Sequence, residues 1–398
     1  MSWEIVKLCD CCQSIADGDH QAPPKAESGV PFVTISNIDH FNRFDFSDTM
    51  FVPQMYYDKL DKRRKAVKGD VLLSVVGSFG IPVLIKDDTP FVFQRHIAIL
   101  RPNPNIIMPE FLYYTMLSKS FYAQADAYAV GAAQRTISLT SLRKMKIAIP
   151  PLEAQNDIVA ILSQYDSAIE NNNKRIKMLE QMAESLYKEW FVRRKGCGWN
   201  LVKMKDFGYS LESGSRPKGG IDASLIDGIP SLGAEAIGKL GEFDYSSIKY
   251  VPAEFYKKMK RGHVCDNDIL LYKDGAYIGK VTLFMDEFPF KEYSINEHVF
   301  IVRSNNPIYQ YYLYFTLKLP QYFTQMQNLN RNAAQPGLTG KGIDLLKLYL
   351  PDEVTIAKFN AAVEPMLHKI FILAKSNQNL TKQRDMLLPR LMSGKLEV

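Results

Sequence analysis

An internal repeat constrains the fold of this 398-residue chain more than any other feature. The triplet Ala-Ala-Gln at residues 132–134 recurs at residues 333–335. The prolines that open two long helical patterns, Pro150 and Pro351, are separated by the same interval of 201 residues. Five further segments recur: residues 3–10, 51–53, 69–73, 96–101 and 112–115 match 199–206, 250–252, 267–271, 298–303 and 313–316. A chain of this length exceeds a single compact core, so we expect two copies of one folding unit.

The spacing of these matches predicts where the two copies differ. It drifts from 196 residues at the first match through 199, 198 and 202 to 201 at residues 112–115, and then stays constant to the end of the helical pattern. Early drift indicates loop insertions, whereas a constant interval indicates helices whose register tolerates no slip. Each half is therefore predicted to be a globular part followed by a long helix.

The globular parts contain short β-branched and aromatic runs separated by glycine and proline turns. Residues 30–39, 69–77 and 93–101 are examples, and such runs are typical of strands. We expect one helix inside each part, at residues 109–122 and 308–323. The globular parts are otherwise predicted to be mostly β.

Seam residues recur at alternating steps of four and three in both helical parts, which is the heptad pattern of a coiled coil. The first series is Ile158, Leu162, Tyr165, Ile169, Asn172, Ile176, Leu179, Ala183, Leu186 and Trp190. The second series is Phe359, Val363, Met366, Ile370, Leu373, Asn377, Leu380, Arg384, Leu387 and Leu391. Pro365 interrupts the second series, so we expect a break or kink there, a main rod to Leu388 and an end at Pro389.

The two helices are expected to pair with each other, because two seam positions per heptad suit a contact between rods. The alternative is that each helix packs on its own globular part. Antiparallel pairing would place the globular parts at opposite ends of a pseudo-twofold frame, and Asn172 and Asn377 are expected to fix its register. The predicted fold class is α+β. Two mostly-β domains, residues 1–149 and 196–350, are separated by helices at residues 150–195 and 351–398 that form an antiparallel coiled coil.

Composition places few limits on function. Five cysteines, an odd number, argue against a disulfide framework and for a reducing cytoplasm. No apolar run approaches the ~20 residues of a membrane span, and the first residues carry no signal-peptide pattern. The net charge of +6 includes basic clusters at residues 62–65, 193–195 and 257–261. Such clusters permit a nucleic-acid partner, but each is also typical of a solvated surface.

The sequence contains no motif of a self-sufficient enzyme. An adenine-methylation motif, a glycine-rich cofactor loop and a phosphate-binding loop are absent, and no acidic cluster with a lysine indicates a nuclease. Cys9, Cys11 and Cys12 lack a second pair of ligands at zinc spacing. His96 and His298 recur in strand-like runs, where we expect buried, hydrogen-bonded histidines. These patterns predict a binding protein built twice, with no active site and no metal of its own.

The order of domains and several motifs resemble the specificity subunit of type I restriction–modification systems over essentially the whole chain. Each half opens on Trp-x-x-Val-Lys-x-x-Asp and carries an Asp-Val-Leu-Leu or Asp-Ile-Leu-Leu run and an Ala-Ala-Gln loop. The segment Pro-Pro-Leu-Glu-Ala-Gln at residues 150–155 is a specific signature of that family, and the tail at residues 391–396 fits its usual ending. The second half departs at residues 350–355, with Leu-Pro-Asp-Glu-Val-Thr, so we expect helix initiation and partner contact to differ there.

The resemblance implies that each globular part is a target-recognition domain that reads half of a split, asymmetric DNA sequence. It implies that the helices set the spacing between the halves and dock two modification subunits, which methylate adenine at N6. Restriction subunits that cut DNA would join that complex. S-adenosylmethionine, ATP and Mg2+ would belong to those partner subunits, so this chain is expected to have no cofactor and not to be an enzyme. The expected location is the cytoplasm of a bacterium or archaeon.

Candidate DNA-binding residues lie in polar loops, and each is as compatible with a solvated turn as with DNA contact. Small side chains in the Ala-Ala-Gln loops allow main-chain N–H groups to approach phosphates, and nearby polar side chains reach phosphates or base edges. In the first half the candidates are Ser74, Ser78, Arg95, Gln134, Arg135, Thr136 and Ser138. In the second half they are Ser213, Ser215, Arg216, Lys218, Lys273, Asp274, Lys280, Arg331, Asn332, Gln335 and Lys341. The counterpart of the loop at Ser213–Lys218 is Asp17, Asp19 and His20, which is far less cationic.

Two other classes of protein remain open. A self-sufficient methyltransferase or nuclease would bind its cofactor as an isolated chain. A non-DNA scaffold would carry two ligand-binding β modules on a coiled coil, and it would lack salt-sensitive binding to duplex DNA.

Overall fold

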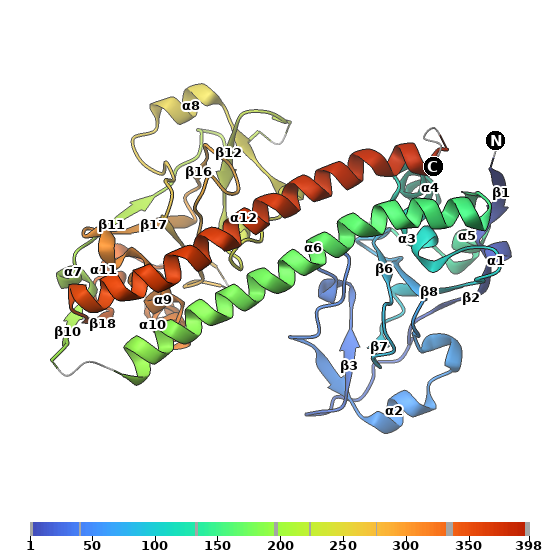
Figure 1. Cartoon of the computed structure of the whole chain (residues 1–398), viewed down its shortest axis with the longest axis horizontal. Coiled ribbons are helices and arrows are strands. Elements are labelled where there is room, and N and C mark those ends of the chain that lie inside the picture. Colours follow the sequence, from blue (N-terminus) through green and yellow to red (C-terminus); the bar gives the residue numbers. More distant parts are fainter. Residues whose placement is uncertain are drawn as a thin grey trace. The chain divides into compact units, whose positions relative to one another are not determined.

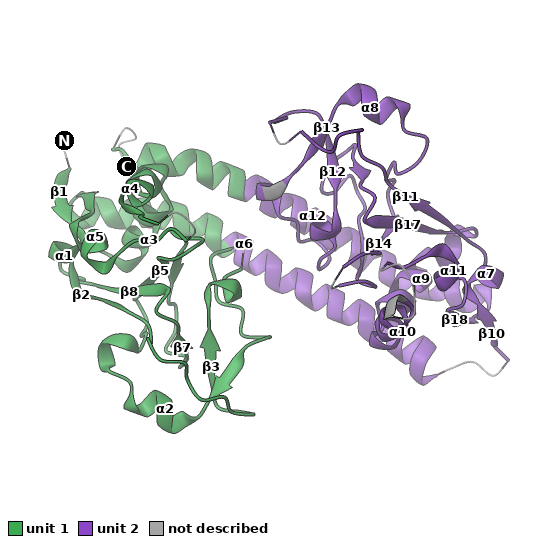
Figure 2. Cartoon of the chain, turned by 180° about the vertical axis from the view of Figure 1, so that it is seen from behind, with its two compact units in different colours: residues 1–167, 381–398 green, residues 168–380 purple. Residues whose placement is uncertain are grey.

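The structure is a computed structural model, and it describes residues 3–39, 41–131, 134–194, 198–222, 224–275, 277–331 and 337–394. The chain divides into two compact units, one formed by residues 1–167 with 381–398 and the other by residues 168–380 (Figures 1 and 2). Each unit contains one globular module and stretches of two long helices. We call the elements from β1 to β9 module 1 and those from β10 to β18 module 2.

Module 1 is built on three small sheets. A two-stranded sheet pairs β1 (Glu4–Lys7) with β9 (Lys146–Ile149), so the beginning and end of the module lie side by side. A four-stranded sheet has the order β2 (Cys12–Asp17), β8 (Ile97–Pro102), β5 (Val71–Ser74) and β6 (Pro82–Leu84). A three-stranded sheet has the order β4 (Met50–Val52), β3 (Val30–Val33) and β7 (Val92–Phe93).

Module 2 repeats the same three sheets. Its two-stranded sheet pairs β10 (Asn200–Lys203) with β18 (Lys347–Leu350). Its four-stranded sheet has the order β11 (Tyr209–Ser213), β17 (Val299–Ser304), β14 (Ile269–Tyr272) and β15 (Val281–Leu283). Its three-stranded sheet has the order β13 (Tyr250–Val251), β12 (Ile229–Leu232) and β16 (Ser294–Ile295).

The strand registers repeat along with the sheets. Lys7 lies opposite Lys146 in module 1, and Lys203 lies opposite Lys347 in module 2. In the four-stranded sheets the equivalent pairs are Val71 with Leu100 and Ile269 with Val302. The predicted internal repeat is therefore confirmed at the level of individual residue pairs. The register also makes Pro82 of β6 the equivalent of Val281 of β15.

The modules contain more helices than the sequence pattern indicated. Module 1 holds α1 (Leu8–Cys11), α2 (Gln54–Lys59), α3 (Pro109–Leu117), α4 (Lys119–Tyr128) and α5 (Leu139–Lys144). Module 2 holds α7 (Met204–Phe207), α8 (Ala253–Lys258), α9 (Gln310–Lys318), α10 (Pro320–Arg331) and α11 (Gly340–Ile343). Short 3-10 turns are Ile35–Asn37, Lys62–Arg64, Ala234–Ala236, Tyr245–Ser247 and Pro307–Tyr309.

The single helix predicted near residues 109–122, and its copy near 308–323, was wrong. Ser118 separates α3 from α4, because its extended backbone ends one helix while its Oγ accepts a hydrogen bond from the Phe121 backbone N–H at 3.2 Å and caps the next. In module 2, Leu319 is extended and Pro320 occupies the first turn of α10, where proline is tolerated.

The long helices are α6 (Leu152–Tyr187), which continues into a π-helical turn at Lys188–Arg193, and α12 (Glu353–Met392). The expected break at Pro365 and end at Pro389 were wrong, because α12 runs through both prolines. Val363 and Leu367 are fully buried on either side of Pro365, which is itself exposed. The carbonyl that loses its partner belongs to the exposed Ala361, so water can satisfy it while packing holds the helix.

In the first unit, the end of α12 runs beside the beginning of α6. Ile158 and Leu162 of α6 share a hydrophobic core with Leu388 and Leu391 of α12. A polar contact joins three helices: Asp166 accepts hydrogen bonds from Arg384 of α12 at 2.7 Å and from Tyr114 of α3 at 2.6 Å. Arg384, which the heptad pattern places on the seam, is therefore satisfied by an acid on the opposite helix.

In the second unit, α12 packs both on α6 and on module 2. Asn172 of α6 donates a hydrogen bond to the side-chain oxygen of Asn377 at 2.9 Å, and Asn377 donates to Asn173 at 2.7 Å. The ring of Phe371 lies 5.6 Å from that of Phe288 in module 2. The two packing modes that the sequence left as alternatives thus occur together on one helix.

The buried face of α12 is correspondingly wider than a two-position seam. Of the predicted seam residues, Ile158, Leu162, Ile169, Ile176, Ile370, Leu373 and Asn377 are buried, while Tyr165, Asn172, Leu179, Leu186, Met366, Leu380 and Leu387 are half-buried. Leu367, Phe371 and Ala374 are also buried, although the heptad pattern omits them. A helix that contacts two neighbours buries a broader stripe than a coiled-coil seam.

Among the described residues, no helix is long and apolar enough to cross a membrane.

Candidate nucleic-acid interface

In module 1, the turn after β5 and the segment that follows the Ala-Ala-Gln triplet lie side by side. The Ile137 backbone N–H donates to the Val75 carbonyl at 2.9 Å, and the Gly77 N–H donates to the Arg135 carbonyl at 2.9 Å. Two loops that are far apart in the sequence therefore form one surface. Residues 132 and 133 of the triplet lie outside the described residues.

Three candidates of this surface have structural tasks. Ser74 is 0% exposed, and its Oγ accepts a hydrogen bond from the Ile81 N–H at 2.9 Å, so its side chain is not available to DNA, contrary to the prediction. Ser138 caps α5 by accepting from the Ser141 N–H at 3.0 Å. The Arg135 guanidinium binds the Asp126 side chain and carbonyl at the end of α4 and lies over the Phe79 ring. The Arg135 guanidinium therefore stabilises the loop after α4 through contacts within the chain.

The remaining module 1 candidates face solvent. Ser78, Arg95 and Gln134 are exposed, and their side chains form no hydrogen bond or ion pair within the described part of the chain. Thr136 is half-buried, and its Oγ1 donates to the Gln134 carbonyl at 3.4 Å. Small polar groups and one free cation on a turn surface suit contacts with phosphate oxygens or base edges.

In module 2, four candidates are brought together with two residues that the sequence did not single out for this surface. Lys273 donates to the Ser213 Oγ at 3.3 Å, and Arg216 pairs with Glu297 at 2.9 Å. His298 links the two pairs, because its carbonyl accepts from the Lys273 backbone N–H at 3.1 Å and its ring lies 3.4 Å from Glu297. The His298 ring also lies 3.1 Å from Asp274. We call Ser213, Arg216, Lys273, Asp274, Glu297 and His298 the polar cluster.

The polar cluster joins the end of β11, the end of β14 and the turn between β16 and β17. It offers two cations and two carboxylates beside a histidine, so donors and acceptors are both available. Such a mixed set suits base edges, whose patterns combine donors and acceptors, better than it suits phosphates alone. The expectation that His298 is buried was wrong: its side chain is 48% exposed. In module 1, burial and the neighbouring Arg95 lower the pKa of the half-buried His96.

Other module 2 candidates lie outside the cluster. Lys218 is exposed, Ser215 is half-buried, and Lys341 is exposed on α11. The Lys280 ammonium lies 4.0 Å from the centroid of the Tyr277 ring. Arg331 is the last residue of α10, but its side chain is not described, and Asn332 and Gln335 lie outside the described residues together with the second Ala-Ala-Gln triplet.

The loop at the end of β2 is the counterpart in module 1 of the loop that holds Ser213 and Ser215, and it carries Asp17 and Asp19 at those positions. Asp17 lies 2.7 Å from the His20 ring nitrogen and 3.8 Å from Arg64, which also reaches Asp19 at 3.8 Å. Tyr56 donates a hydrogen bond to Asp19, and burial together with this bond raises the pKa of Tyr56 to about 12. The same place in the fold thus carries different chemistry in the two modules.

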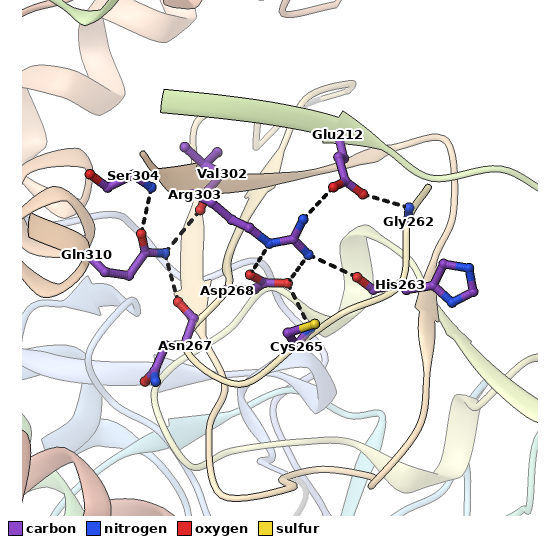
Figure 3. A network of polar contacts seen from close by, with 10 residues as sticks. All are labelled: Glu212, Gly262, His263, Cys265, Asn267, Asp268, Val302, Arg303, Ser304 and Gln310. Carbon is purple, nitrogen blue, oxygen red and sulfur yellow. Dashed lines mark hydrogen bonds and ion pairs between the residues drawn. The ribbon is translucent and has the colours of Figure 1, made fainter. Parts of the chain in front are cut away.

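Each module also contains an arginine–aspartate pair, and Figure 3 shows the one in module 2. In module 2, Arg303 binds Asp268 through two nitrogens at 2.5 and 2.6 Å, binds Glu212, and donates to the His263 carbonyl at 3.0 Å. In module 1, Arg101 binds Asp70 at 2.9 and 2.8 Å and donates to the Lys65 carbonyl at 3.0 Å. The hydrogen bonds to Asp268 raise the pKa of Arg303 further above its usual range. Because the pairs are built alike, they hold equivalent chain segments in both modules.

The cysteine run of the sequence is part of α1. Cys11 is buried and donates to the Leu8 carbonyl at 3.4 Å, whereas the exposed Cys9 donates to Asp10 at 3.2 Å. A search of the described residues finds no group of three His, Cys, Asp or Glu side chains placed to hold a metal ion.

The fold and its surfaces define a class of protein: one α+β module occurs twice beside two long helices, with a polar loop surface of different composition on each copy. Residues 2–181 match the family described as the type I restriction modification DNA specificity domain. The chain is 24% identical to a Methanocaldococcus jannaschii protein that carries the name of the MjaX type I restriction enzyme specificity subunit, covering 100% of this chain and 94% of that protein.

Two further comparisons agree. The chain is 24% identical to the type I restriction enzyme MjaIX specificity subunit of Methanocaldococcus jannaschii, over 83% of this chain and 78% of the relative. Its fold is similar to the crystal structure of the type I restriction–modification system S subunit from M. genitalium, with a TM-score of 0.57, 16% identity, and coverage of 98% and 96% of the two chains. Residues 2–181 thus carry the DNA specificity domain of type I restriction–modification systems, and the whole chain is similar to specificity subunits of such systems.

Proposed function

We propose that this chain binds duplex DNA and supplies the sequence recognition of a type I restriction–modification complex. Each module reads one half of a bipartite, asymmetric site. Ser78, Arg95 and Gln134 in module 1 and the polar cluster in module 2 are the surfaces that face the bases and the neighbouring phosphates. Phosphate contacts dominate the affinity, so binding is strongly salt-dependent.

The observation that carries this proposal is the contrast between a repeated frame and diverged loops. The strand pairs of the two modules coincide residue by residue, as Lys7 with Lys146 and Lys203 with Lys347 show. At the end of the first strand of each four-stranded sheet, however, module 1 presents Asp17 while module 2 presents Ser213. Two copies of one frame with unlike loops suit two unlike half-sites on a duplex.

The long helices set the spacing between the half-sites and dock two modification subunits, which methylate adenine at N6. Restriction subunits, which translocate and cut DNA, complete the assembly. This chain is the non-catalytic member of the complex and works in the cytoplasm. S-adenosylmethionine, ATP and Mg2+ are bound by the partner subunits.

The experiment that tests the proposal is a methylome. The chain is expressed with the modification subunit encoded beside it, and host DNA is sequenced by a method that detects N6-methyladenine. We expect a methylated motif of two short blocks separated by a fixed unread gap, absent when this chain is omitted. A matched pair of variants sharpens the assay. Arg216→Gln with Lys273→Gln, in the polar cluster, changes the bases of one block, whereas Lys203→Gln with Lys205→Gln, exposed on β10 and α7, changes neither.

Two outcomes would contradict the proposal. An assembled complex that yields no methylated motif would show that the modules do not recognise DNA. A chain that neither assembles with a modification subunit nor binds duplex DNA would favour a scaffold with ligand-binding β modules.

A further inference from the structure

Each module carries a short run of cations directly after an exposed helix. In module 1 the run begins with the last residue of α2 and comprises Lys59, Lys62, Arg63, Arg64 and Lys65, which we call basic segment 1. In module 2 it begins in the last turn of α8 and comprises Lys257, Lys258, Lys260 and Arg261, which we call basic segment 2. Figure 1 shows α8 at the rim of module 2, beyond β12, and α2 at the rim of module 1, beyond β7.

The two segments are anchored by the same buried contacts, although their sequences differ. Arg101 donates to the carbonyl of Lys65, and Arg303 donates to the carbonyl of His263, each at 3.0 Å. The aspartate of each pair then receives a backbone N–H from the chain beyond the segment: Asp70 from Val67 at 2.9 Å and Asp268 from Cys265 at 2.8 Å. Each module therefore fixes the exit of its basic segment by one ion pair.

The segments also adjoin the candidate loops. Gly262, directly after basic segment 2, lies so close to the loop after β11 that a Cβ on it would be 3.0 Å from Gly214 Cα, and its N–H donates to Glu212 at 3.0 Å. In module 1, Arg64 reaches Asp17 and Asp19 at 3.8 Å. A duplex held against either loop surface therefore comes within reach of the neighbouring cations.

The two segments differ in how much of their charge is free. In basic segment 1, Arg63 pairs with Asp61 at 3.0 Å, Arg64 pairs with two aspartates, and Lys65 donates to the Asp58 carbonyl at 2.9 Å. Lys59 and Lys62 are exposed, and their side chains have no partner in the described part of the chain. In basic segment 2, Lys257 lies 3.7 Å from Glu254. Lys258, Lys260 and Arg261 are exposed, and they form no hydrogen bond or ion pair with any residue that the structure describes.

We propose that basic segment 2 is the main phosphate-binding element of this chain, that basic segment 1 is its weaker counterpart, and that Arg303 and Asp268 position it. Free cations on a rim release counterions from the DNA backbone when they bind, whereas cations that already have carboxylate partners release fewer. The two half-sites are consequently bound with unequal contributions from phosphate contacts. Module 2 supplies most of the sequence-independent affinity, and module 1 depends more on its base contacts. This inference rests on the proposed function.

The test measures the salt dependence of binding by the full chain. Lys258→Gln, Lys260→Gln and Arg261→Gln are combined, and the observed binding constant for a mixed-sequence duplex of about 30 base pairs is followed by fluorescence anisotropy between about 50 and 200 mM salt. The slope of log binding constant against log salt concentration is expected to become less negative by roughly 2 to 3. This change corresponds to about 0.9 for each lost phosphate contact. The matched control, Lys358→Gln with Lys369→Gln and Lys382→Gln, removes the same charge from exposed positions on α12 and leaves the slope unchanged.

A second triple variant tests the inequality of the two segments. Lys59→Gln, Lys62→Gln and Arg63→Gln in basic segment 1 are expected to reduce the slope by roughly 1.8, less than the loss for basic segment 2, because Arg63 already has a partner and only two free cations are removed. The charge-conserving variant Lys258→Arg, Lys260→Arg and Arg261→Lys keeps the wild-type slope and shows that the segment tolerates substitution.

The outcomes separate this inference from the proposed function. A basic segment 2 variant that matches the α12 control overturns the inference while the wild-type chain still binds duplex. Equal losses in the two segments overturn the inequality. A wild-type chain without salt-dependent duplex binding overturns the proposed function itself.

Discussion

Arg303 holds Asp268 in a two-pronged ion pair, and Arg101 holds Asp70 in the same way at the equivalent place of module 1. Asp268 is 3% exposed. Removing its charge leaves the arginine without its main partner, and breaking a buried pair from one side costs about 3–5 kcal/mol. We expect Asp268→Asn to lower the free energy of unfolding by about 3 kcal/mol, the lower end of that range, because Arg303 keeps Glu212. Urea unfolding followed by circular dichroism measures it.

The matched control for this substitution is Asp274→Asn, which removes the same charge from a partly exposed residue of the polar cluster. It is expected to change the free energy of unfolding by less than about 1 kcal/mol. Equal effects of the two substitutions would show that the buried pair has no special part in holding module 2 together.

Gln155, the last residue of the Pro-Pro-Leu-Glu-Ala-Gln signature, has a structural explanation that yields a second prediction. It is 0% exposed; its oxygen accepts from the Met108 N–H, and its nitrogen donates to the carbonyls of Ile106 and Pro150, each at 2.9 Å. Gln155→Leu leaves these backbone groups unpaired, so we expect a loss of about 3 kcal/mol in the free energy of unfolding. Gln164→Leu, at an exposed position of α6, serves as the control and should change it by no more than about 0.5 kcal/mol. A small loss for both would mean that water replaces the lost contacts.

The signature could not be transferred to the second half of the chain. Ile356, which stands 201 residues after Gln155, is fully buried and brings no polar group. Instead the Pro351 carbonyl, the counterpart of the Pro150 carbonyl, accepts a hydrogen bond from the Tyr309 hydroxyl at 2.9 Å. Similar backbone needs are met from different positions, and one sequence does not reveal such a relocation.

The repeat itself was predictable because strands and turns are marked by local sequence patterns. Segments such as residues 69–73 and 267–271 carry apolar runs that fold into β5 and β14 in equivalent registers. The course of α12 was not predictable in this way. The effect of Pro365 depends on the burial of Val363 and Leu367, which is a property of the tertiary fold.

The sequence predicted the candidate site less well than it predicted the fold. Ser74 and Ser78 are neighbours in one polar turn, yet one is fully buried and the other exposed. Whether each serine is buried depends on the direction in which the chain leaves β5, and a single sequence does not show that direction. Glu297 and the surface position of His298 were missed for a related reason, because the polar cluster joins residues from three separate segments. A signal did exist for the basic segments: both follow the second short helix of their module, and the repeat aligns them.

Gly214 gives a third prediction, because the chain passes very close to it. A Cβ at this position would lie 2.0 Å from the Ile295 carbonyl oxygen, and one at Gly18 in module 1 would lie 2.3 Å from the Phe93 oxygen. We expect Gly214→Ala to lower the free energy of unfolding by about 1–3 kcal/mol, since the backbone must move. Gly238→Ala, where no atom lies within 4 Å of the added Cβ, is the control and should be neutral. Thermal unfolding of both variants decides; an unchanged midpoint for Gly214→Ala would contradict the close approach.

Glu297 yields a prediction about binding rather than stability. Its carboxylate pairs with Arg216 at 2.9 Å and lies 3.4 Å from His298, so it neutralises a cation on the surface that we assign to DNA. Glu297→Gln removes the negative charge and leaves Arg216 available to a phosphate. We expect affinity for a mixed-sequence duplex to rise roughly two- to fivefold at about 0.15 M salt, with a steeper salt dependence by roughly 1. Anisotropy titrations measure both, with Glu153→Gln on the exposed side of α6 as the charge-matched control. If affinity falls, or rises equally in the control, the polar cluster does not face the duplex.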